Sequence, residues 1–393
     1  MIDSIVIASY ARTPMGGFQG ALSGATAIEL GSTAVRAAVE RSGVDPAVID
    51  RIYMGCVLPA GLGQAPARQA ALGAGLPDSV EATTVNKMCG SGMQATIMAT
   101  EALMAGTVDV VVAGGMESMT NAPFLLAKHR AGARIGHDIV SDSMMLDGLE
   151  DAYEKGKPMG AFAEDTATEY QFTRHAQDAF AIESLARANA AITSGGFADE
   201  VVPVTVRTRG GDVLVCEDEQ PGKAKPEKIP GLRPAFAKDG TITAATSASI
   251  SDGAAALVLT RASIAKKLGL SQEAVIVATA AHAQAPAKFT TAPVFAIRKV
   301  LERAGWSIGD VDLFEVNEAF ATVAMIAMHD LGIPRDKLNV NGGATALGHP
   351  IGASGARIIA TIVAALKRRG LKKGVAALCI GGGEATAIAV ELV

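Results

Sequence analysis

Two stretches of this chain, AVRAAVERSGVDPAVIDRIYMG (34–55) and AIRKVLERAGWSIGDVDLFEVN (296–317), match each other at a constant offset of 262 residues. The register aligns identical residues, namely Arg36 with Arg298, Glu40 with Glu302, Arg41 with Arg303, Gly43 with Gly305 and Asp50 with Asp312. The strand-like segments before them, IVIASYARTP (5–14) and VIVATAAHAQAP (275–286), are also similar. Several matches in the same order predict two similar α/β halves within one chain.

Further matches extend the duplication towards the ends of both halves. Ser91-Gly92 aligns with Ser354-Gly355, and the segment AGGME aligns with GGGEA. The continuous apolar runs VDVVVAGG (108–115) and GVAALCIGG (374–382) are typical of strands that helices cover on both faces. Each half is therefore expected to run strand, helix, strand, helix, strand.

A long segment separates the two halves and contains the polar, Gly- and Pro-rich stretches GKPMGAFAED and EDEQPGKAKPEKIPG. It also contains one clear helix pattern, RHAQDAFAIESLARANAAI (174–192). Insertions of this length in compact enzymes usually form lids or binding segments. The run SISDGAAALVL then reads as the last strand of the first half. We expect an N-terminal half (1–118 plus 249–270), an inserted loop domain (119–248) and a C-terminal half (271–393).

Composition limits the possible partners and compartment. The net charge of −5 argues against a nucleic-acid partner, because no excess of basic residues is available to neutralise phosphates. No apolar run approaches the ~18 residues of a membrane helix, and MIDSIVIASYARTP lacks the pattern of a signal peptide. Four cysteines are too few for a disulfide scaffold and suit a reducing compartment. We expect a cytoplasmic protein that contacts neither nucleic acid nor membrane.

The segment NKMCGSGMQA (86–95) places Cys89 between a strand-like run and a helix-like run. Most free cysteines are small buried hydrophobes. A thiol at a helix N-terminus, however, faces unpaired N–H groups that lower its pKa, and the adjacent glycines allow another group to approach. The letters GSGMQA also fit a dinucleotide-binding turn, with Glu117 as the acidic residue. Asn86 and Lys87 count against that alternative, because they are polar where its first strand should end.

The second half supplies three more candidates at the ends of predicted strands. His349 lies in the Gly-rich turn of NVNGGATALGHPIGASGARI, Cys379 precedes three glycines in LCIGGGEA, and Asn317 follows a strand in EVNEAF. Each residue also has a purely structural interpretation. Together with Cys89, however, all four lie at strand-to-helix or strand-to-loop corners, where open α/β sheets bind ligands.

The segments NKMCGSG, EVNEAFA, NGGATALGHPIGASGAR and CIGGGEA, in this order and spacing, resemble the four motif blocks of the thiolases. The resemblance covers essentially the whole chain and is closest to the biosynthetic branch of that family. It implies a duplicated, five-layered α/β/α/β/α fold with an inserted loop domain, and a homotetramer. It also implies condensation of two acetyl-CoA molecules to acetoacetyl-CoA and the reverse thiolysis, with no metal and no cofactor besides the CoA substrates.

The resemblance also implies roles for individual residues. Cys89 takes up the acetyl group as a thioester after His349 accepts its proton, and Cys379 is the acid/base of the carbon–carbon step. Asn317 holds a water that, with His349, stabilises the enolate oxygen. The backbone N–H groups of Cys89 and Gly381 stabilise the tetrahedral oxyanion.

Substrate contacts follow from the same resemblance. Met159 and Phe289 fall where biosynthetic thiolases line the acyl pocket, and Pro158 replaces the histidine usual before that methionine. Ala248 stands in place of a serine that contacts CoA, so Ser247 or Ser249 is a candidate substitute. The arginine expected near the CoA phosphate is missing, which leaves nearby lysines as candidates: Lys223, Lys225 and Lys228.

Three other functions stay open at the level of sequence. Within the family, a degradative 3-ketoacyl-CoA thiolase of broader chain length is the main alternative. A thiolase-like protein that binds acyl-CoA or lipid without turnover is a second, although all four motif residues are present. An NAD-dependent oxidoreductase is the third and rests only on the short glycine motif.

Overall fold

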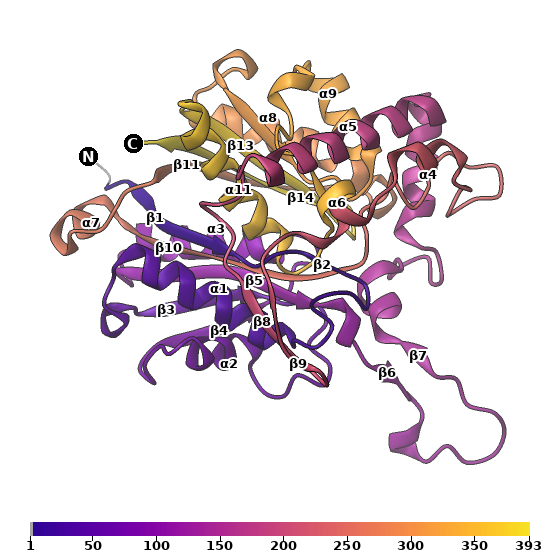
Figure 1. Ribbon diagram of the computed structural model, residues 1–393, viewed down its shortest axis with the longest axis horizontal. Coiled ribbons are helices and arrows are strands. Elements are labelled where there is room, and N and C mark those ends of the chain that lie inside the picture. The colour runs from indigo at the N-terminus through magenta and orange to yellow at the C-terminus, as the bar shows by residue number, and fades with distance from the viewer. Residues whose placement is uncertain (1–2) are drawn as a thin grey trace.

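The computed structural model describes residues 3–393, and its larger strands belong to two corresponding halves (Figure 1). The first half contributes β1 (Ile5–Arg12), β3 (Arg51–Gly55), β4 (Glu81–Val85), β5 (Val110–Ser118) and β10 (Ser251–Arg261). The second half contributes β11 (Ala274–Ala283), β12 (Leu313–Val316), β13 (Lys373–Ile380) and β14 (Glu384–Leu392). The matching order of strands along the two halves reflects the duplication in the sequence.

Each half forms a sheet, and the two sheets join at one edge. The order is β1-β10-β5-β3-β4 in the first half and β11-β14-β13-β12 in the second, with β2 (Gly16–Gly17) added beside β10. β1 and β11 pair antiparallel over only three residues, Ile5 to Ile7. In the second half a single parallel bridge, Phe314 to Leu338, takes the place of β4.

Helices cover both sheets and fill the space between them. The outer helices of the first half are α1 (Ala27–Ser42) and α2 (Pro66–Gly73), those of the second half are α8 (Ala292–Ala304) and α9 (Ala321–Leu331), and the central pair is α3 (Ser91–Met104) and α11 (Ser354–Arg369). Three apolar cores lie outside the first sheet, between the sheets and outside the second. The layers are therefore helix, sheet, helix, sheet, helix, which confirms the predicted five-layered fold.

Repeated residues make the same local contacts in both halves. Gly43 ends α1 and Gly305 ends α8, each with a left-handed φ of 70° that favours glycine. Asp50 accepts hydrogen bonds from the backbone N–H groups that open β5, and Asp312 accepts them from those that open β13. The residues that are identical at an offset of 262 therefore have the same structural role in each half.

The central helices α3 and α11 cross near their N-termini because both have glycine there. A Cβ on Gly92 would lie 2.8 Å from the backbone nitrogen of Ala356, and a Cβ on Gly355 would lie 2.3 Å from that of Met93. Neither position leaves space for a side chain. The aligned Ser-Gly pairs of the sequence therefore meet at the centre of the molecule, next to the loops that carry Cys89 and His349.

The segment between the halves forms several small elements around one end of the sheets. Its helices are α4 (Met159–Glu169), α5 (Arg174–Thr193) and α6 (Glu219–Lys223), and its strands form two hairpins, β6 (Phe124–Leu125) with β7 (Ser141–Asp142) and β8 (Val204–Thr208) with β9 (Gly211–Val215). The two remaining helices are α7 (Ala262–Leu268) and α10 (Ala344–Leu347). The β6–β7 hairpin leads into an arm that projects from the body (Figure 1).

Buried ion pairs attach the inserted segment to the first sheet. Arg12 on β1 is fully buried and donates to Glu200 at 2.7 Å and to Asp218 at 2.6 Å. A charge removed from water must be paired to be tolerated, so these contacts fix where the segment lies over the sheet. Among residues 3–393, no helix combines the length and apolar character needed to cross a membrane.

Candidate active site

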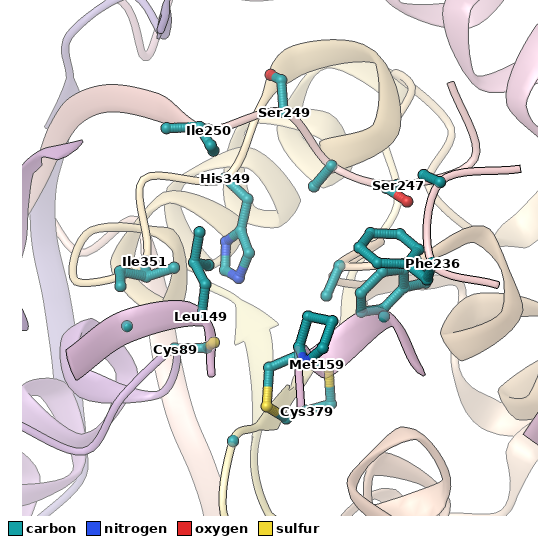
Figure 2. Close-up of a pocket in the computed structure, with 18 of the residues that line it drawn as sticks. Cys89, Leu149, Met159, Phe236, Ser247, Ser249, Ile250, His349, Ile351 and Cys379 are labelled. Carbon is teal, nitrogen blue, oxygen red and sulfur yellow. The ribbon is translucent and has the colours of Figure 1, made fainter. Parts of the chain in front are cut away.

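A cavity of about 420 Å³ lies where the loops of both halves meet the inserted segment (Figure 2). Most of the residues predicted from sequence line it: Cys89, Met159, Ser247, Ala248, Ser249, Phe289, His349, Cys379 and Gly381. Asn317 lies behind the wall, and Lys223 and Lys225 are not part of the lining. The cavity therefore brings two thiols and one imidazole together on a mostly apolar surface.

Cys89 lies in the turn between β4 and α3, and the residue before it is strained. Met88 adopts a left-handed φ of 47°, which is unfavourable for a residue with a side chain. The Met88 N–H donates to Asn86 Oδ1 at 3.0 Å, and Ser91 Oγ donates to the Met88 carbonyl at 2.6 Å. These bonds hold the strained turn, which directs the thiol of Cys89 into the cavity (Figure 2).

The protonation of Cys89 differs from the prediction made from its place before a helix. Burial raises the pKa of the Cys89 thiol to about 11, although the backbone N–H groups of Gly381 and Cys89 itself oppose the rise. The helix N-terminus therefore does not by itself produce a thiolate, because loss of water outweighs it. Cys89 needs a base. The same two N–H groups point to the place where charge would develop at the sulfur.

His349 can be that base because its ring is held neutral in one tautomer. Ser354 Oγ donates its only hydrogen to the Pro350 carbonyl oxygen at 2.9 Å. It must therefore act as the acceptor in its 2.5 Å contact with His349 Nδ1, so Nδ1 carries a hydrogen. Nε2 then carries the free lone pair. Burial, assisted by the positive charge of Arg357, lowers the pKa of His349 to about 3. The imidazole is thus unprotonated at neutral pH.

Asn317 contacts the imidazole and is itself buried, outside the residues that line the cavity. Its amide nitrogen lies 3.4 Å from His349 Nδ1 and 3.5 Å from Nε2, which is longer than an ordinary hydrogen bond. Its oxygen accepts from Arg357, which also donates to Glu315. Arg357 and Glu315 were not predicted from sequence. The sequence did contain a signal for both, because Arg357 stands within an otherwise apolar helix pattern and Glu315 within an apolar strand pattern, and buried charges are rare.

Cys379 is the second-last residue of β13 and is buried at the base of the cavity (Figure 2). Burial, and then the proximity of Cys89, raises the pKa of its thiol well above the ordinary value. Gly382 and Gly383 follow with φ values of 94° and 87°, a conformation that favours glycine. The turn leaves the N–H of Gly381 beside Cys89, as described above.

The inserted segment supplies most of the apolar wall. Met159 opens α4, and Phe289 lies in the short helix η6 (Pro286–Thr291) and packs edge-on against Phe320. Phe320 and other lining residues were not predicted, because their chain positions are far apart and no local pattern marks them: Met119, Leu149, Phe236 and Ile351. These side chains give the cavity a mostly apolar wall next to the thiols.

The residues predicted to contact CoA are only partly placed near the cavity. Ser247 Oγ donates to the Thr243 carbonyl at 2.9 Å, and Ser249 Oγ bonds Ser251 Oγ at 3.0 Å. Lys223 forms an ion pair with Glu219 on the same helix. Within residues 3–393, no group of three or more His, Cys, Asp or Glu could hold a metal ion.

Comparison with known proteins identifies the family. The model of the thiolase N-terminal domain matches residues 5–263, and that of the thiolase C-terminal domain matches residues 270–392. The chain belongs to the thiolase family. The two models together span nearly the whole chain, and the GSGMQA turn lies inside the first of them, so a dinucleotide-binding oxidoreductase is not favoured.

Relatives of this thiolase are similar over their full length. It is 50% identical to "Acetyl-CoA acetyltransferase 2" of Arabidopsis thaliana, covering 99% of this chain and 97% of the relative. It is 47% identical to an acetyl-CoA acetyltransferase of Thiocystis violacea, with 100% of both chains covered.

Two solved structures share the fold of this thiolase. The Bacillus anthracis acetyl-CoA acetyltransferase superposes with a TM-score of 0.97 at 41% identity and covers 100% of this chain and 99% of its own. The Acat5 thiolase of Ascaris suum, solved in complex with coenzyme A, gives a TM-score of 0.94 at 41% identity. The match covers 99% of this chain and 100% of the Ascaris suum chain.

Proposed function

We propose that this thiolase is an acetyl-CoA C-acetyltransferase. It condenses two acetyl-CoA molecules to acetoacetyl-CoA and CoA, and it catalyses the reverse thiolysis. The observation that carries the proposal is a single apolar cavity lined by Cys89, His349 and Cys379, in a chain whose full-length relatives are named for this activity. Acetyl-CoA, acetoacetyl-CoA and CoA are its substrates and products, with no separate cofactor.

In the first half-reaction His349 Nε2 takes the proton of the Cys89 thiol, and the sulfur attacks the carbonyl carbon of acetyl-CoA. The negative charge moves to the carbonyl oxygen, which the N–H groups of Cys89 and Gly381 stabilise. The intermediate collapses with cleavage of the carbon–sulfur bond to CoA, and the CoA sulfur leaves with the proton of the Cys379 thiol. The products are CoA, acetyl-Cys89, a Cys379 thiolate and a His349 imidazolium that keeps the proton taken from Cys89.

In the second half-reaction Cys379 acts as the base. Its thiolate removes a proton from the methyl carbon of a second acetyl-CoA, and the enolate oxygen is stabilised by the Nε2–H of the His349 imidazolium and by a water held by Asn317. The carbanion attacks the acetyl-Cys89 carbonyl, the Cys89 sulfur leaves as the carbonyl re-forms, and it regains its proton from His349 Nε2. In thiolysis the direction reverses, with Cys379 accepting the proton of the CoA thiol.

The cavity wall supports a short acyl group. Met159 and Phe289 close the chamber on the side of the inserted segment, and Phe289 is held by Phe320. We propose that Ser247 or Ser249 contacts the CoA arm, since both lie at the cavity and Ala248 between them has no polar side chain. Lys225 is the proposed phosphate contact, with Lys223 engaged by Glu219.

The inserted segment, residues 119–248, is proposed to cover the active site and to carry the contacts of a homotetramer. Exposed apolar side chains gather on its arm, including Phe124, Ile135, Ile139 and Val140. Four free thiols at Cys56, Cys89, Cys216 and Cys379 suit a reducing environment, and we propose the cytoplasm as the compartment.

Labelling with radioactive acetyl-CoA in a single turnover tests the assignment of the two thiols. Cys89→Ser should take up no label, because a hydroxyl is far less ionised than a thiol. Cys379→Ser should retain a stable acetyl group on Cys89 but lose about 10²–10⁴ in the rate of condensation and thiolysis. Label on Cys89→Ser and none on Cys379→Ser would reverse the two roles, and no label on the unmodified enzyme would reject the activity.

A further inference from the structure

Arg357 is a buried cation directly behind the wall of the active-site cavity. It lies in the first turn of α11 and is only 1% exposed. A cation is unfavourable there for two reasons. Burial removes the water that solvates the charge, and the charge lies at the positive end of the helix dipole. Where a residue breaks a local rule this strongly, a functional site is the usual reason.

The contacts of Arg357 connect it to two residues at the end of β12. Nη1 donates to Glu315 Oε1 at 2.9 Å, and Nη2 donates to Asn317 Oδ1 at 3.3 Å. Glu315 and Asn317 are two positions apart and therefore project to the same side of the extended chain. One planar guanidinium thus spans both side chains, which a single ammonium group on a shorter stem cannot do.

These contacts decide which way the Asn317 amide points. A guanidinium has only donors, so the Asn317 group that faces it must be the carbonyl oxygen. The amide nitrogen is then turned towards His349, where it lies 3.4 Å and 3.5 Å from the two ring nitrogens. Without Arg357 the amide could rotate and present an acceptor, instead of a donor, to the imidazole.

We propose that Arg357 is a positioning residue for the reaction: it fixes the Asn317 amide with its nitrogen facing His349, while Glu315 holds the guanidinium in place. This inference rests on the proposed function, because it acts through Asn317 and His349. Arg357 does not touch the cavity, so it has no direct role at the reacting atoms.

A double-mutant cycle between Arg357→Lys and Asn317→Ala tests this inference. Lysine keeps the charge but cannot span both partners. Asn317→Ala is expected to lower kcat for thiolysis of acetoacetyl-CoA by about 10²–10³ through loss of a stabilising donor. Arg357→Lys should lower kcat by about 10–100-fold, which is a smaller loss than that of Asn317→Ala. Its KM should stay within about twofold of the KM of the unmodified enzyme. The double variant should be no slower than Asn317→Ala alone, because residues that act as a unit are not additive.

Matched controls separate this role from a structural one. Arg298→Lys, on the exposed face of α8, should match the unmodified enzyme in kcat and KM. Glu315→Gln, which loosens the guanidinium while keeping the shape, should show the same lack of additivity with Asn317→Ala, and it replaces Arg357→Lys if that variant does not fold. Labelling of Cys89 with acetyl-CoA should persist in every folded variant.

Two results would overturn the role of Arg357. One is an Arg357→Lys enzyme with unchanged kcat, and the other is a double variant whose loss is the product of the two single losses. Both leave the proposed function intact as long as the unmodified enzyme forms acetyl-Cys89. Absence of that adduct in the unmodified enzyme rejects the proposed function instead.

Discussion

The site residues that could be predicted from sequence are those that lie in short, unusual motifs. Cys89, His349 and Cys379 each follow or precede several glycines, and the structure places all three at one cavity. The pKa of Cys89 was predicted with the wrong sign, because the sequence shows a helix start but not how much water the fold removes. Arg357 and Glu315 were missed for a related reason. Their importance comes from burial and from partners 40 and 42 residues away along the chain.

Glu117, the acidic residue of the dinucleotide-binding alternative, is a fully buried carboxylate. In the structure its carboxylate accepts hydrogen bonds of 2.9–3.1 Å from the backbone N–H groups of Val57, Leu58 and Gly352. It therefore connects the loop after β3 to the turn that carries His349. Burial raises the pKa of Glu117 to about 7 despite these hydrogen bonds.

The raised pKa gives a prediction for stability. Because the folded protein holds the proton more tightly than the unfolded chain, the contribution of Glu117 is fully present below a pH of about 4.5. It is then lost as the pH rises through about 7. Relative to a Glu117→Gln variant, the unmodified protein should lose about 2 kcal/mol in the free energy of unfolding between pH 5 and pH 8.

Urea unfolding at pH 5, 6, 7 and 8 measures this difference. Other titrating groups, including His349, are present in both proteins and cancel when the two curves are subtracted. Glutamine cannot accept all three N–H groups, so the variant should be less stable at pH 5. Parallel curves for the two proteins would show that Glu117 does not titrate in this range.

At the scale of elements, the crossing of α3 and α11 explains why the aligned Ser-Gly pairs are needed. Both helices begin just after the loops that carry Cys89 and His349, and a side chain at their contact would separate those loops. The sequence predicted both helices and their glycines from the duplication. It did not predict the crossing itself, because that contact depends on how the two halves pack face to face.

Gly355→Ala is therefore expected to destabilise the protein by about 3 kcal/mol. The added methyl group would lie 2.3 Å from the backbone nitrogen of Met93, which cannot move like a flexible side chain. Gly222→Ala is the matched control, since nothing lies within 4 Å of its added methyl group and it belongs to a helix. That control should be neutral or more stable by up to about 1 kcal/mol. The midpoint of urea unfolding measures both, and an unchanged midpoint for Gly355→Ala would contradict the close crossing.

At the scale of the molecule, the duplication predicted most of the fold because each half repeats the same constraints. Asp50 and Asp312 fix the start of equivalent strands, and Gly43 and Gly305 end equivalent helices. The three-residue junction of β1 with β11 and the direction of the arm were not predictable. Neither feature leaves a local pattern in the sequence. The junction is a contact between the edges of two sheets, and the direction of the arm depends on the elements that surround it.

The arm between β6 and β7 provides the last prediction, which concerns assembly. Ile135 is 100% exposed and Ile139 is 72% exposed, an unusual concentration of apolar surface on a projecting segment. If four chains associate through these arms, light scattering should give four times the chain mass of 40.0 kDa. A variant with Ile135→Asp and Ile139→Asp should give a smaller assembly, because carboxylates are costly to bury at an interface.

Met104→Asp is the control for that variant, since Met104 is 60% exposed on α3 and lies outside the arm. It should keep the mass of the unmodified protein. Both variants should still acquire an acetyl group on Cys89, because neither change touches the cavity. A monomer for the unmodified protein, or a tetramer for the arm variant, would show that the exposed isoleucines serve another purpose. A loss of mass confined to the arm variant would assign the apolar surface to contact between copies of this chain.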